Sequence, residues 1–494
     1  MKLNKRIITV MSAILTLFLV IVVYLTWFTF SDNSEVDEYK ESVRKKEKES
    51  HVMRGKIYDR NGILLAENEI IEVPEKNEAG KVVDTQKVQR RKYPYKGLYA
   101  HTIGYVSKGG DKTGIEKSFD DELRKTRTEE FFDRRDEDGE RIYQNGASLE
   151  LTLDHGMTQL AAKLLEKNNE VGSIVAINPK TGEVYCLYSN PSFDPTPDAL
   201  GEKFEALSND PSKPFVFRAA ESGYAPGSTF KMITATAGIE VGFGDFSVND
   251  QGSTTIGGKT FKNTESQKSN GNIGMDDAVR VSSNVYFVEL SQKIGIDKMK
   301  EVIESFYVTA DIDFDIPTTD ATDLRYNDMD AAKLAATSIG QGDLQISPLQ
   351  MALAACAIAN DGVIMQPYLV SKAYFEDDKV LGDERQPEEL SVVTDKKTAR
   401  KVRDYMVGCV EEKGGTAYNY ARVEGIKIAG KTGTAQTGSG KKEHTWFIGM
   451  APANDPQLVV CVMKEHSGGG GGSKCGEPAA EIIKYAMENG LIKY

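Results

Sequence analysis

Apolar residues in the larger, C-terminal part of the chain recur at the spacings of helices and strands. Residues 157–165 follow a helical pattern, and apolar runs at 173–177 and 183–188 flank a turn, as in a β-hairpin. Further helical patterns and strands lie, in order, at 229–240, 275–294, 297–306, 329–339, 347–360, 396–413, 426–436, 445–451, 457–464 and 479–489. This order predicts an α/β fold of the α+β type, with one five-stranded antiparallel sheet flanked by helices.

The first thirty residues follow a different pattern. No charged residue occurs from Ile7 to Phe30, and a helix of this length would cross a bilayer core of about 30 Å. Basic residues precede this segment, so the positive-inside rule predicts a cytoplasmic N-terminus and an extracytoplasmic remainder. A cleaved signal peptide is the alternative, but the run is long and residues 24–28 do not form a small-residue cleavage site. We therefore expect a single-pass anchor in the cell membrane.

The region between the anchor and the sheet has no sustained apolar period. Residues 31–50 carry interleaved charges, which is typical of a solvated juxtamembrane helix, and residues 51–155 predict short strands and many turns. We expect three parts: a cytoplasmic stub with the anchor at 1–30, an extended extracytoplasmic scaffold domain at 31–155, and a larger domain at 156–494. Five glycines at 468–472 predict a flexible connection from a strand to the last helix.

Composition excludes some classes of function. Lys and Arg total 61 against 74 Asp and Glu, so the net charge is -13, and without a long basic run we expect no binding to nucleic acid. The five cysteines do not form a disulfide scaffold, and the five histidines lack the close spacing of a metal site. Cys475 lies in a polar, glycine-rich stretch and is a candidate free thiol, whereas the other four cysteines lie in apolar stretches and are expected in the core: Cys186, Cys356, Cys409 and Cys461.

Three short motifs occur in the order Ser-x-x-Lys, Ser-x-Asn and Lys-Thr-Gly, a combination that accompanies an activated serine nucleophile. Each motif occurs three times, so the surrounding sequence has to select the functional copy. The copies are Ser42/Lys45, Ser228/Lys231 and Ser439/Lys442; Ser31/Asn33, Ser247/Asn249 and Ser282/Asn284; and Lys112, Lys180 and Lys431.

The Ser228 copy of the first motif has the most suitable context. It follows Pro226-Gly227 and opens a helical pattern, and Lys231 shares the first turn of that helix. The positive end of the helix favours a serine alkoxide and disfavours a protonated lysine, so Lys231 could act as a base near neutral pH. A plain helix N-cap is the alternative interpretation of Ser228.

The other two motifs are selected in the same way. Ser282 and Asn284 lie between two helical patterns, where a rigid loop suits a proton shuttle. Lys431 follows a strand, and Gly433 would remove a side chain so that a substrate backbone could approach that strand. The N–H of Thr434 could then bind a developing oxyanion beside the N–H of Ser228.

The triple at 228–231, 282–284 and 431–434 resembles the serine penicillin-binding proteins and serine β-lactamases. Other stretches resemble the class B penicillin-binding proteins in particular, and so do the single anchor and the lack of a glycosyltransferase region. These stretches are 54–62, 100–106, 114–116, 190–195, 218–219, 339–342 and 444–447. The resemblance implies a penicillin-binding transpeptidase fold behind a dimerisation or pedestal-like scaffold. It also implies peptidoglycan D,D-transpeptidation.

The resemblance also implies a role for each motif. Ser228 would attack the D-Ala-D-Ala carbonyl of a donor stem peptide, Lys231 would take its proton, and Ser282 would relay a proton to the leaving D-Ala with Lys431 tuning the relay. An amine of a neighbouring stem would then resolve the acyl-enzyme. Three residues would bind the donor, Asn284 its backbone amide, and Thr432 and Thr434 its terminal carboxylate.

The family further implies acylation by β-lactams, no metal or cofactor, and a polytopic membrane glycosyltransferase as partner. Ser283 occupies the position where β-lactamases typically have Asp. Two alternatives are a hydrolase of the same fold, either a carboxypeptidase or a β-lactamase, and a non-enzymatic β-lactam sensor or assembly scaffold. A sensor would need a larger cytoplasmic part than about six residues, and a degenerate scaffold should have lost a catalytic residue.

Overall fold

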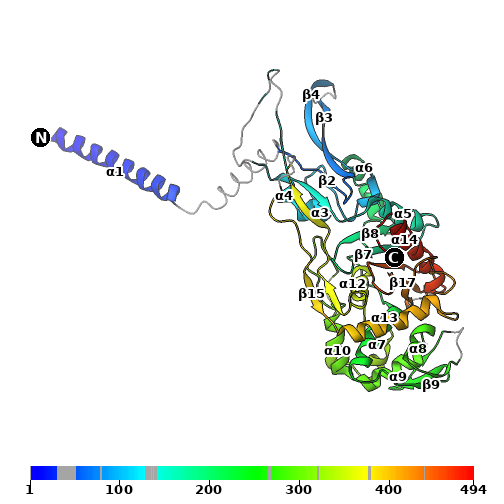
Figure 1. The fold of residues 1–494 in the computed structure, drawn as a ribbon. Coiled ribbons are helices and arrows are strands. Elements are labelled where there is room, and N and C mark those ends of the chain that lie inside the picture. Colours follow the sequence, from blue (N-terminus) through cyan, green and yellow to red (C-terminus); the bar gives the residue numbers. More distant parts are fainter. Residues whose placement is uncertain are drawn as a thin grey trace. The chain divides into compact units, whose positions relative to one another are not determined.

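The computed structural model describes residues 2–30, 52–77, 81–127, 135, 137, 142–264, 269–319, 322–375, 380–438 and 440–494. Two compact units emerge, one from residues 1–53 with 126–145 and the other from residues 54–125 with 146–494 (Figure 1). The predicted juxtamembrane helix and the motif copies that begin at Ser31, Ser42 and Ser439 lie outside the described residues.

The first unit contains the predicted membrane anchor. Helix α1 (Lys2–Phe30) includes an apolar stretch, Lys5–Trp27, that is long enough to cross a membrane and has no part buried against the protein. The same unit holds a short parallel pair, β1 (Val52–Met53) with β5 (Gln144–Asn145). The helix is consistent with a single membrane anchor, and its orientation across the membrane stays a prediction.

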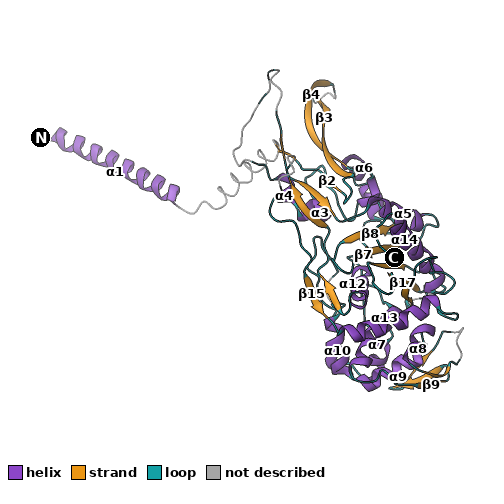
Figure 2. Cartoon of the chain, in the orientation of Figure 1, coloured by secondary structure: helices purple, strands orange, loops and turns teal. Residues whose placement is uncertain are grey.

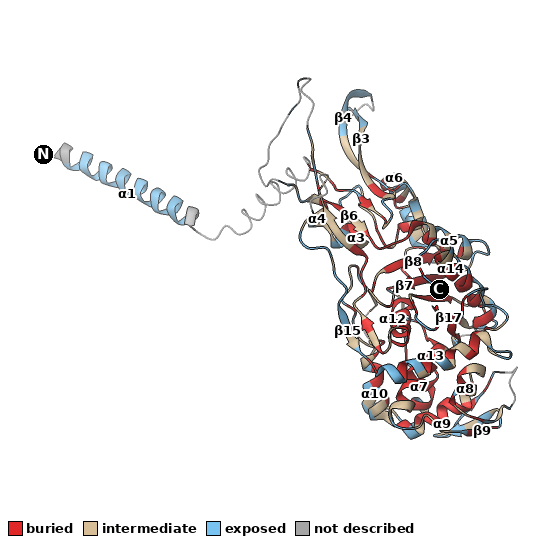
Figure 3. Cartoon of the chain, in the orientation of Figure 1, coloured by how far each residue is buried: buried red, intermediate tan, exposed pale blue. Residues whose placement is uncertain are grey.

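The second unit is built on the predicted five-stranded antiparallel sheet, which confirms the fold class (Figure 2). Its strands are, in spatial order, β16 (Ala429–Ala435), β17 (His444–Ala451), β18 (Leu458–Lys464), β7 (Gly172–Ile177) and β8 (Val184–Asn190). Almost every residue in these strands is buried, because helices cover the sheet, and inner strands such as β18 are nearly continuous apolar runs (Figure 3). Strand β16 is the edge of this sheet.

Helices pack against this sheet and form a lobe beside it. Helices α5 (His155–Glu166) and α14 (Glu477–Glu488) contact each other and the sheet, and α12 (Pro348–Ala359), buried along its whole length, contacts β7, β17 and β18. The other helices are α6 (Pro197–Ser208), α7 (Lys231–Glu240), α8 (Met275–Val281), α9 (Asn284–Ile294), α10 (Ile296–Ser305), α11 (Ala331–Ser338) and α13 (Lys396–Glu411), with 3-10 turns η2 (Gly227–Phe230) and η3 (Tyr326–Asp328). Antiparallel pairs join β9 (Val248–Asp250) to β12 (Gly271–Ile273), β10 (Ser253–Ile256) to β11 (Lys259–Lys262), and β13 (Val363–Met365) to β15 (Glu389–Val392).

A second five-stranded sheet forms the N-terminal part of this unit. Its order is β14 (Val370–Tyr374), β6 (Ser148–Leu151), β2 (Ile57–Tyr58), β3 (Leu64–Lys76) and β4 (Val82–Lys92). The turn η1 (Lys96–Tyr99) and the short helices α3 (Gly114–Ser118) and α4 (Asp120–Arg124) complete this part. Strands β3 and β4 have 13 and 11 residues, so the prediction of short strands is wrong for this hairpin. Because residues 54–125 share one compact unit with residues 146–494, these contacts draw no boundary at 155/156, and that boundary stays a prediction.

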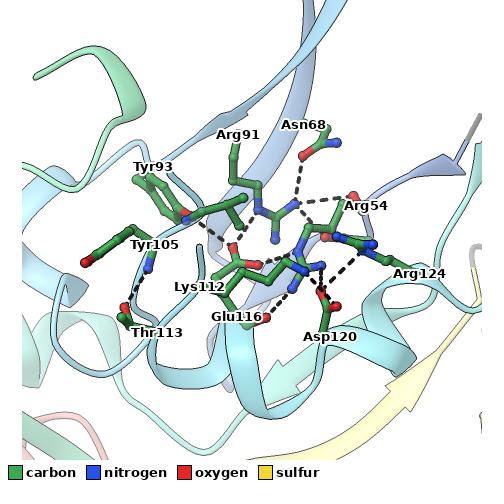
Figure 4. Close-up of polar contacts among 12 residues, drawn as sticks. Arg54, Asn68, Arg91, Tyr93, Tyr105, Lys112, Thr113, Glu116, Asp120 and Arg124 are labelled. Atoms are coloured by element: carbon green, nitrogen blue, oxygen red, sulfur yellow. Dashed lines mark hydrogen bonds and ion pairs between the residues drawn. The ribbon is translucent and has the colours of Figure 1, made fainter. Parts of the chain in front are cut away.

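A buried ionic network stabilises this N-terminal part (Figure 4). The Glu116 carboxylate is fully buried and accepts hydrogen bonds from Arg54 Nε and Arg91 Nε, and Arg54 also pairs with Asp120. Lys112, one of the discarded motif lysines, pairs with Asp120 as well. Because the charges face opposite charges at hydrogen-bond distance, the network compensates for their removal from water.

The glycine-rich segment differs from its prediction. A Cβ on Gly471 would lie 2.3 Å from the Trp446 carbonyl oxygen and 2.5 Å from the Gly433 carbonyl oxygen, so this backbone packs tightly against β16 and β17. The segment continues as a π-helical turn, η4 (Gly472–Gly476), into α14. The prediction of a flexible connection is therefore wrong for Gly471 and Gly472 and stays a prediction for residues 468–470. Cys475 is a free thiol, as predicted, but it is buried like the other four cysteines, and it donates to the Thr445 carbonyl oxygen over 3.3 Å.

Candidate functional site

The Ser228 turn is fixed between two backbone segments. Gly227 adopts a φ of 56°, and a Cβ there would lie 2.5 Å from the Thr434 carbonyl oxygen. On the other side, the Gly227 N–H donates to the Gly340 carbonyl oxygen over 2.9 Å. Only glycine fits a left-handed position in such close contact, so the sequence Pro-Gly-Ser places Ser228 beside strand β16.

Ser228 lies in the 3-10 turn η2, and the α-helix itself begins at Lys231. The residues at the N-cap positions of η2 and α7 are Pro226 and Phe230. The interpretation of Ser228 as a plain N-cap is therefore wrong. The Ser228 hydroxyl is partly exposed and makes no hydrogen bond to either motif lysine in the described part of the chain.

The Lys231 amine is fully buried, and its hydrogen-bond partners among the described residues all belong to the second motif. Its Nζ lies 2.7 Å from the Ser282 carbonyl oxygen, 2.7 Å from Asn284 Oδ1 and 3.3 Å from the Ser282 hydroxyl. A break between α8 and α9 makes this possible. Ser282 ends α8 with a φ of 62°, in the left-handed region, and Ser283 caps α9 by accepting from the Tyr286 N–H.

The third motif, on strand β16, also contacts the Ser282 hydroxyl. Lys431 Nζ, also fully buried, donates to the Ser282 Oγ over 2.8 Å and to the Thr432 carbonyl oxygen over 3.3 Å. Two amines from separate elements therefore share one serine hydroxyl. Residues of all three motifs therefore lie together, and the roles predicted for them stay predictions.

Burial disfavours the charged form of both amines. Removal from water lowers the pKa of Lys231 well below its usual value, and the nearby Lys431 lowers it further, while Cys409 and Asp250 oppose the shift. Burial also lowers the pKa of Lys431. A neutral Lys231 keeps two hydrogens for the Ser282 carbonyl and Asn284, so its lone pair is available to accept a proton.

Strand β16 carries the remaining predicted residues. The Thr432 hydroxyl donates to the Thr416 hydroxyl over 2.8 Å, and the 227–228 turn lies against the backbone of Thr434. The reason given for Gly433 needs correction. A Cβ there would lie 2.7 Å from the Pro226 carbonyl oxygen and 3.0 Å from the Thr229 methyl group, so the missing side chain makes room for the turn that carries Ser228 and not for a substrate.

Sequence reasoning missed two residues of this region, Thr416 and Asp250. Thr416 follows two glycines in the loop after α13, and no pattern distinguished it. Asp250 belongs to the segment that held the discarded copy Ser247/Asn249, and its buried carboxylate accepts from the Ser283 hydroxyl over 2.7 Å. The discarded Lys180 lies in the turn between β7 and β8 and pairs with Asp455.

The geometry fits acyl transfer by an activated serine. Ser228 lies beside an edge strand whose N–H groups can bind an oxyanion, and two buried amines lie nearby in the chain and the sheet, at Lys231 and on β16 at Lys431. Within the described ranges, no group of three or more His, Cys, Asp or Glu side chains is placed to hold a metal ion.

Two family models match the chain. The model of the penicillin-binding protein transpeptidase domain matches residues 172–488, and the model of the penicillin-binding protein A dimerisation domain matches residues 54–149. The predicted boundary at 155/156 lies between the two matched segments.

The chain is also similar to characterised proteins over most of its length. It is 32% identical to the peptidoglycan D,D-transpeptidase PbpA of Mycolicibacterium smegmatis, over 76% of this chain and 79% of the relative. The D,D-transpeptidase domain of a peptidoglycan glycosyltransferase from Eggerthella lenta has a TM-score of 0.75 and 32% identity, covering 90% of this chain and all 100% of that one. Penicillin-binding protein A from M. tuberculosis, solved as a ceftriaxone acyl-enzyme, has a TM-score of 0.77 and 26% identity, covering 89% and 99%.

Proposed function

The chain belongs to the penicillin-binding proteins that carry a transpeptidase domain and is a peptidoglycan D,D-transpeptidase, and from this premise we propose that Ser228 is the residue acylated in its reaction. The observation that carries the proposal is the convergence of Lys231 and Lys431 on the Ser282 hydroxyl, at 3.3 and 2.8 Å, beside the turn that presents Ser228. Two desolvated amines that share the Ser282 hydroxyl, next to a turn that carries a partly exposed serine, are typical of a catalytic site and support this assignment.

In the first step, Ser228 Oγ bonds to the carbonyl carbon of the penultimate D-Ala of the donor stem. Its proton passes to Lys231, because burial lowers the pKa of this amine well below its usual value and so favours the neutral form that can accept a proton. The N–H groups of Ser228 and Thr434 bind the oxyanion, since the turn lies against Thr434.

In the second step, the bond from that carbon to the nitrogen of the terminal D-Ala breaks. The departing amine takes a proton from the Ser282 hydroxyl, which is replenished from Lys231, and Lys431 holds that hydroxyl in place. An amine of a neighbouring stem then attacks the acyl-enzyme and reforms the Ser228 hydroxyl. β-Lactams acylate Ser228 in the same way.

The donor binds as an extended strand along β16. This strand is the sheet edge, so its outer backbone groups can pair with a peptide. Asn284 holds the donor's backbone amide, and Thr432 and Thr434 bind its terminal carboxylate.

Helix α1 anchors the enzyme with its N-terminus in the cytoplasm and the enzyme domain outside, beside a polytopic membrane glycosyltransferase that supplies glycan strands.

Covalent labelling tests the nucleophile. The full-length protein should be labelled by a fluorescent penicillin, and Ser228→Ala should abolish the label. Ser253→Ala, at an exposed serine in β10, is the matched control and should be labelled normally. Labelling of Ser228→Ala at the normal rate would reject this serine as the nucleophile.

A second assay separates transfer from hydrolysis. A donor peptide that ends in D-Ala-D-Ala is mixed with a labelled D-amino acid as acceptor. Exchange of the terminal residue supports transpeptidation, whereas hydrolysed product without exchange would favour a carboxypeptidase.

A further inference from the structure

Asp250 is a buried carboxylate that the proposed mechanism does not use. It ends strand β9, has no exposed surface, and forms no ion pair with the described basic side chains. An isolated carboxylate is costly to bury, so its surroundings have to compensate for the lost water. We propose that Asp250 is a positioning residue that fixes the second motif against Lys231. This inference rests on the proposed function of the same site.

The carboxylate is held entirely by neutral donors. It accepts from the Ser283 hydroxyl at 2.7 Å, from Asn263 Nδ2 at 2.9 and 2.8 Å, from Asn270 Nδ2 at 2.5 Å and from the Gly252 N–H at 2.8 Å. Burial opposes ionisation, but the hydrogen bonds from Asn270, Ser283 and Asn263 outweigh it and hold the pKa of Asp250 below its usual range. Asp250 is therefore a charged anchor point for three side chains.

Two of those side chains, Asn263 and Ser283, connect Asp250 to the start of α9 through hydrogen bonds. Asn263 Oδ1 accepts the N–H of Asn284 over 2.8 Å and the N–H of Val285 over 3.2 Å. Ser283, which donates to Asp250, also accepts the Tyr286 N–H over 3.0 Å. The first backbone N–H groups of the helix are thus satisfied by side chains that Asp250 orients.

The helix start in turn places the groups that Lys231 touches. Asn284 accepts from Lys231 Nζ, and Ser282, the residue before Ser283, offers both its carbonyl and its hydroxyl. A rotation of Ser283 or Asn263 would move all three acceptors, because these acceptors lie on Ser282 and Asn284, the two residues that flank Ser283. Asp250 therefore acts on the reaction through geometry, without touching the substrate.

The charge of Asp250 also reaches Lys231. Among the groups that act on this amine, Lys431 lowers its pKa, whereas Cys409 and Asp250 raise it against the larger effect of burial. Replacing the carboxylate by an amide should therefore lower the pKa of Lys231 further. A general loosening of the structure would do the opposite, because water would restore the usual pKa.

The test compares Asp250→Asn with Asp245→Asn, the same chemical change at an exposed position five residues earlier. Full-length variants are acylated with a fluorescent penicillin across a range of pH, and the folded fraction is measured in parallel. We expect Asp250→Asn to acylate roughly 100-fold more slowly at neutral pH, the effect of displacing a catalytic group by about 1 Å. The acid limb of its pH profile should move to lower pH, and Asp245→Asn should match the wild type.

Two more variants keep the test decisive if Asp250→Asn folds poorly. The double variant Asp250→Asn/Asn263→Asp exchanges acceptor and donor across the same hydrogen bonds, and it should recover part of the rate and of the pH profile. Asn270→Ala removes a single donor and should slow acylation by a smaller factor.

Asp250 is rejected as a positioning residue if Asp250→Asn acylates like Asp245→Asn per folded molecule, or if the exchange variant is no faster than Asp250→Asn. It is also rejected if the acid limb moves to higher pH. These outcomes differ from failure of the proposed function, which would appear as normal labelling of Ser228→Ala.

Discussion

The buried carboxylate of Glu116 provides a quantitative test of how this fold is held together. Its Oε1 accepts from Arg91 Nε over 2.6 Å and from the Tyr93 hydroxyl over 3.3 Å, and its Oε2 accepts from Arg54. Glu116→Gln keeps the shape but removes the charge and turns an NH2 group toward a guanidinium. Arg54 retains Asp120 as a partner. Arg91 would retain only neutral acceptors, the carbonyls of Arg54 and Gly55 and the side chain of Asn68.

The expected loss of stability follows from the fact that Arg54 keeps a charged partner whereas Arg91 does not. Removing one partner of a buried ion pair typically costs about 3–5 kcal/mol, since the other charge stays buried without compensation. The matched control is Glu69→Gln, which breaks an ion pair with Arg90 whose side chains are 29% and 36% exposed. Such a surface pair contributes about 0–1 kcal/mol. Glu116→Gln should therefore destabilise the protein by at least about 2 kcal/mol more than Glu69→Gln.

The measurement is equilibrium urea unfolding of the full-length variants in detergent, followed by tryptophan fluorescence. The chain has two tryptophans, and Trp446 lies fully buried in β17, within the same compact unit as Glu116. The arginines lower the pKa of Glu116 despite its burial, so its stabilising effect is present above the usual Glu pKa of about 4.3 and is lost as the pH falls through the lower, folded-state pKa. The difference in free energy of unfolding between the wild type and Glu116→Gln should therefore become smaller at acid pH. Equal free energies of unfolding for the two variants at pH 7 would refute this reasoning.

Three further predictions concern the site. Ser282→Ala and Ser282→Gly should both slow penicillin acylation by about 10²–10⁴-fold. In urea unfolding, the glycine variant should be more stable than the alanine variant by about 1 kcal/mol, because a φ of 62° is costly for alanine. Equal free energies of unfolding for the two variants would contradict backbone strain at this position. Gly433→Ala should slow acylation by displacing Pro226, whereas Gly201→Ala, in open space on α6, should acylate normally and melt no lower than the wild type. Removing the Lys431 charge, as in Lys431→Met, should raise the pKa of Lys231 and move the acid limb of the acylation profile to higher pH; a limb that stays in place would exclude that electrostatic effect.

The sequence predicted most of the enzyme domain because its elements bury one face or both. Strands such as 458–464 are continuous apolar runs, and the helical pattern at 275–294 appears in the structure as α8 and α9. The break at Ser282 and Ser283 is the loop that the context of the second motif predicts between two helical patterns, although the apolar period alone runs on through it. That break depends on hydrogen bonds to partners elsewhere in the chain.

The other differences between the predictions and the structure arise where contacts between distant residues, and not a local sequence pattern, determine the conformation. The β3–β4 hairpin has polar residues on both faces, so it lacks the alternation that marks a half-buried strand. Asp250 and Asn263 lie on or beside short strands of three and four residues, and their importance comes from contacts that no local pattern records. The glycine run suggested flexibility because composition does not show that β16 packs against Gly471.

The position of β16 at the sheet edge has a consequence for inhibition. Its outer amide and carbonyl groups have no neighbouring strand in the described part of the chain, and such an edge accepts any extended backbone of matching length. A peptide mimic that adds as a sixth strand would compete with the stem peptide without acylating Ser228. Resistance to such a compound would be difficult to acquire by changing side chains, because the contacts that hold it belong to the main chain.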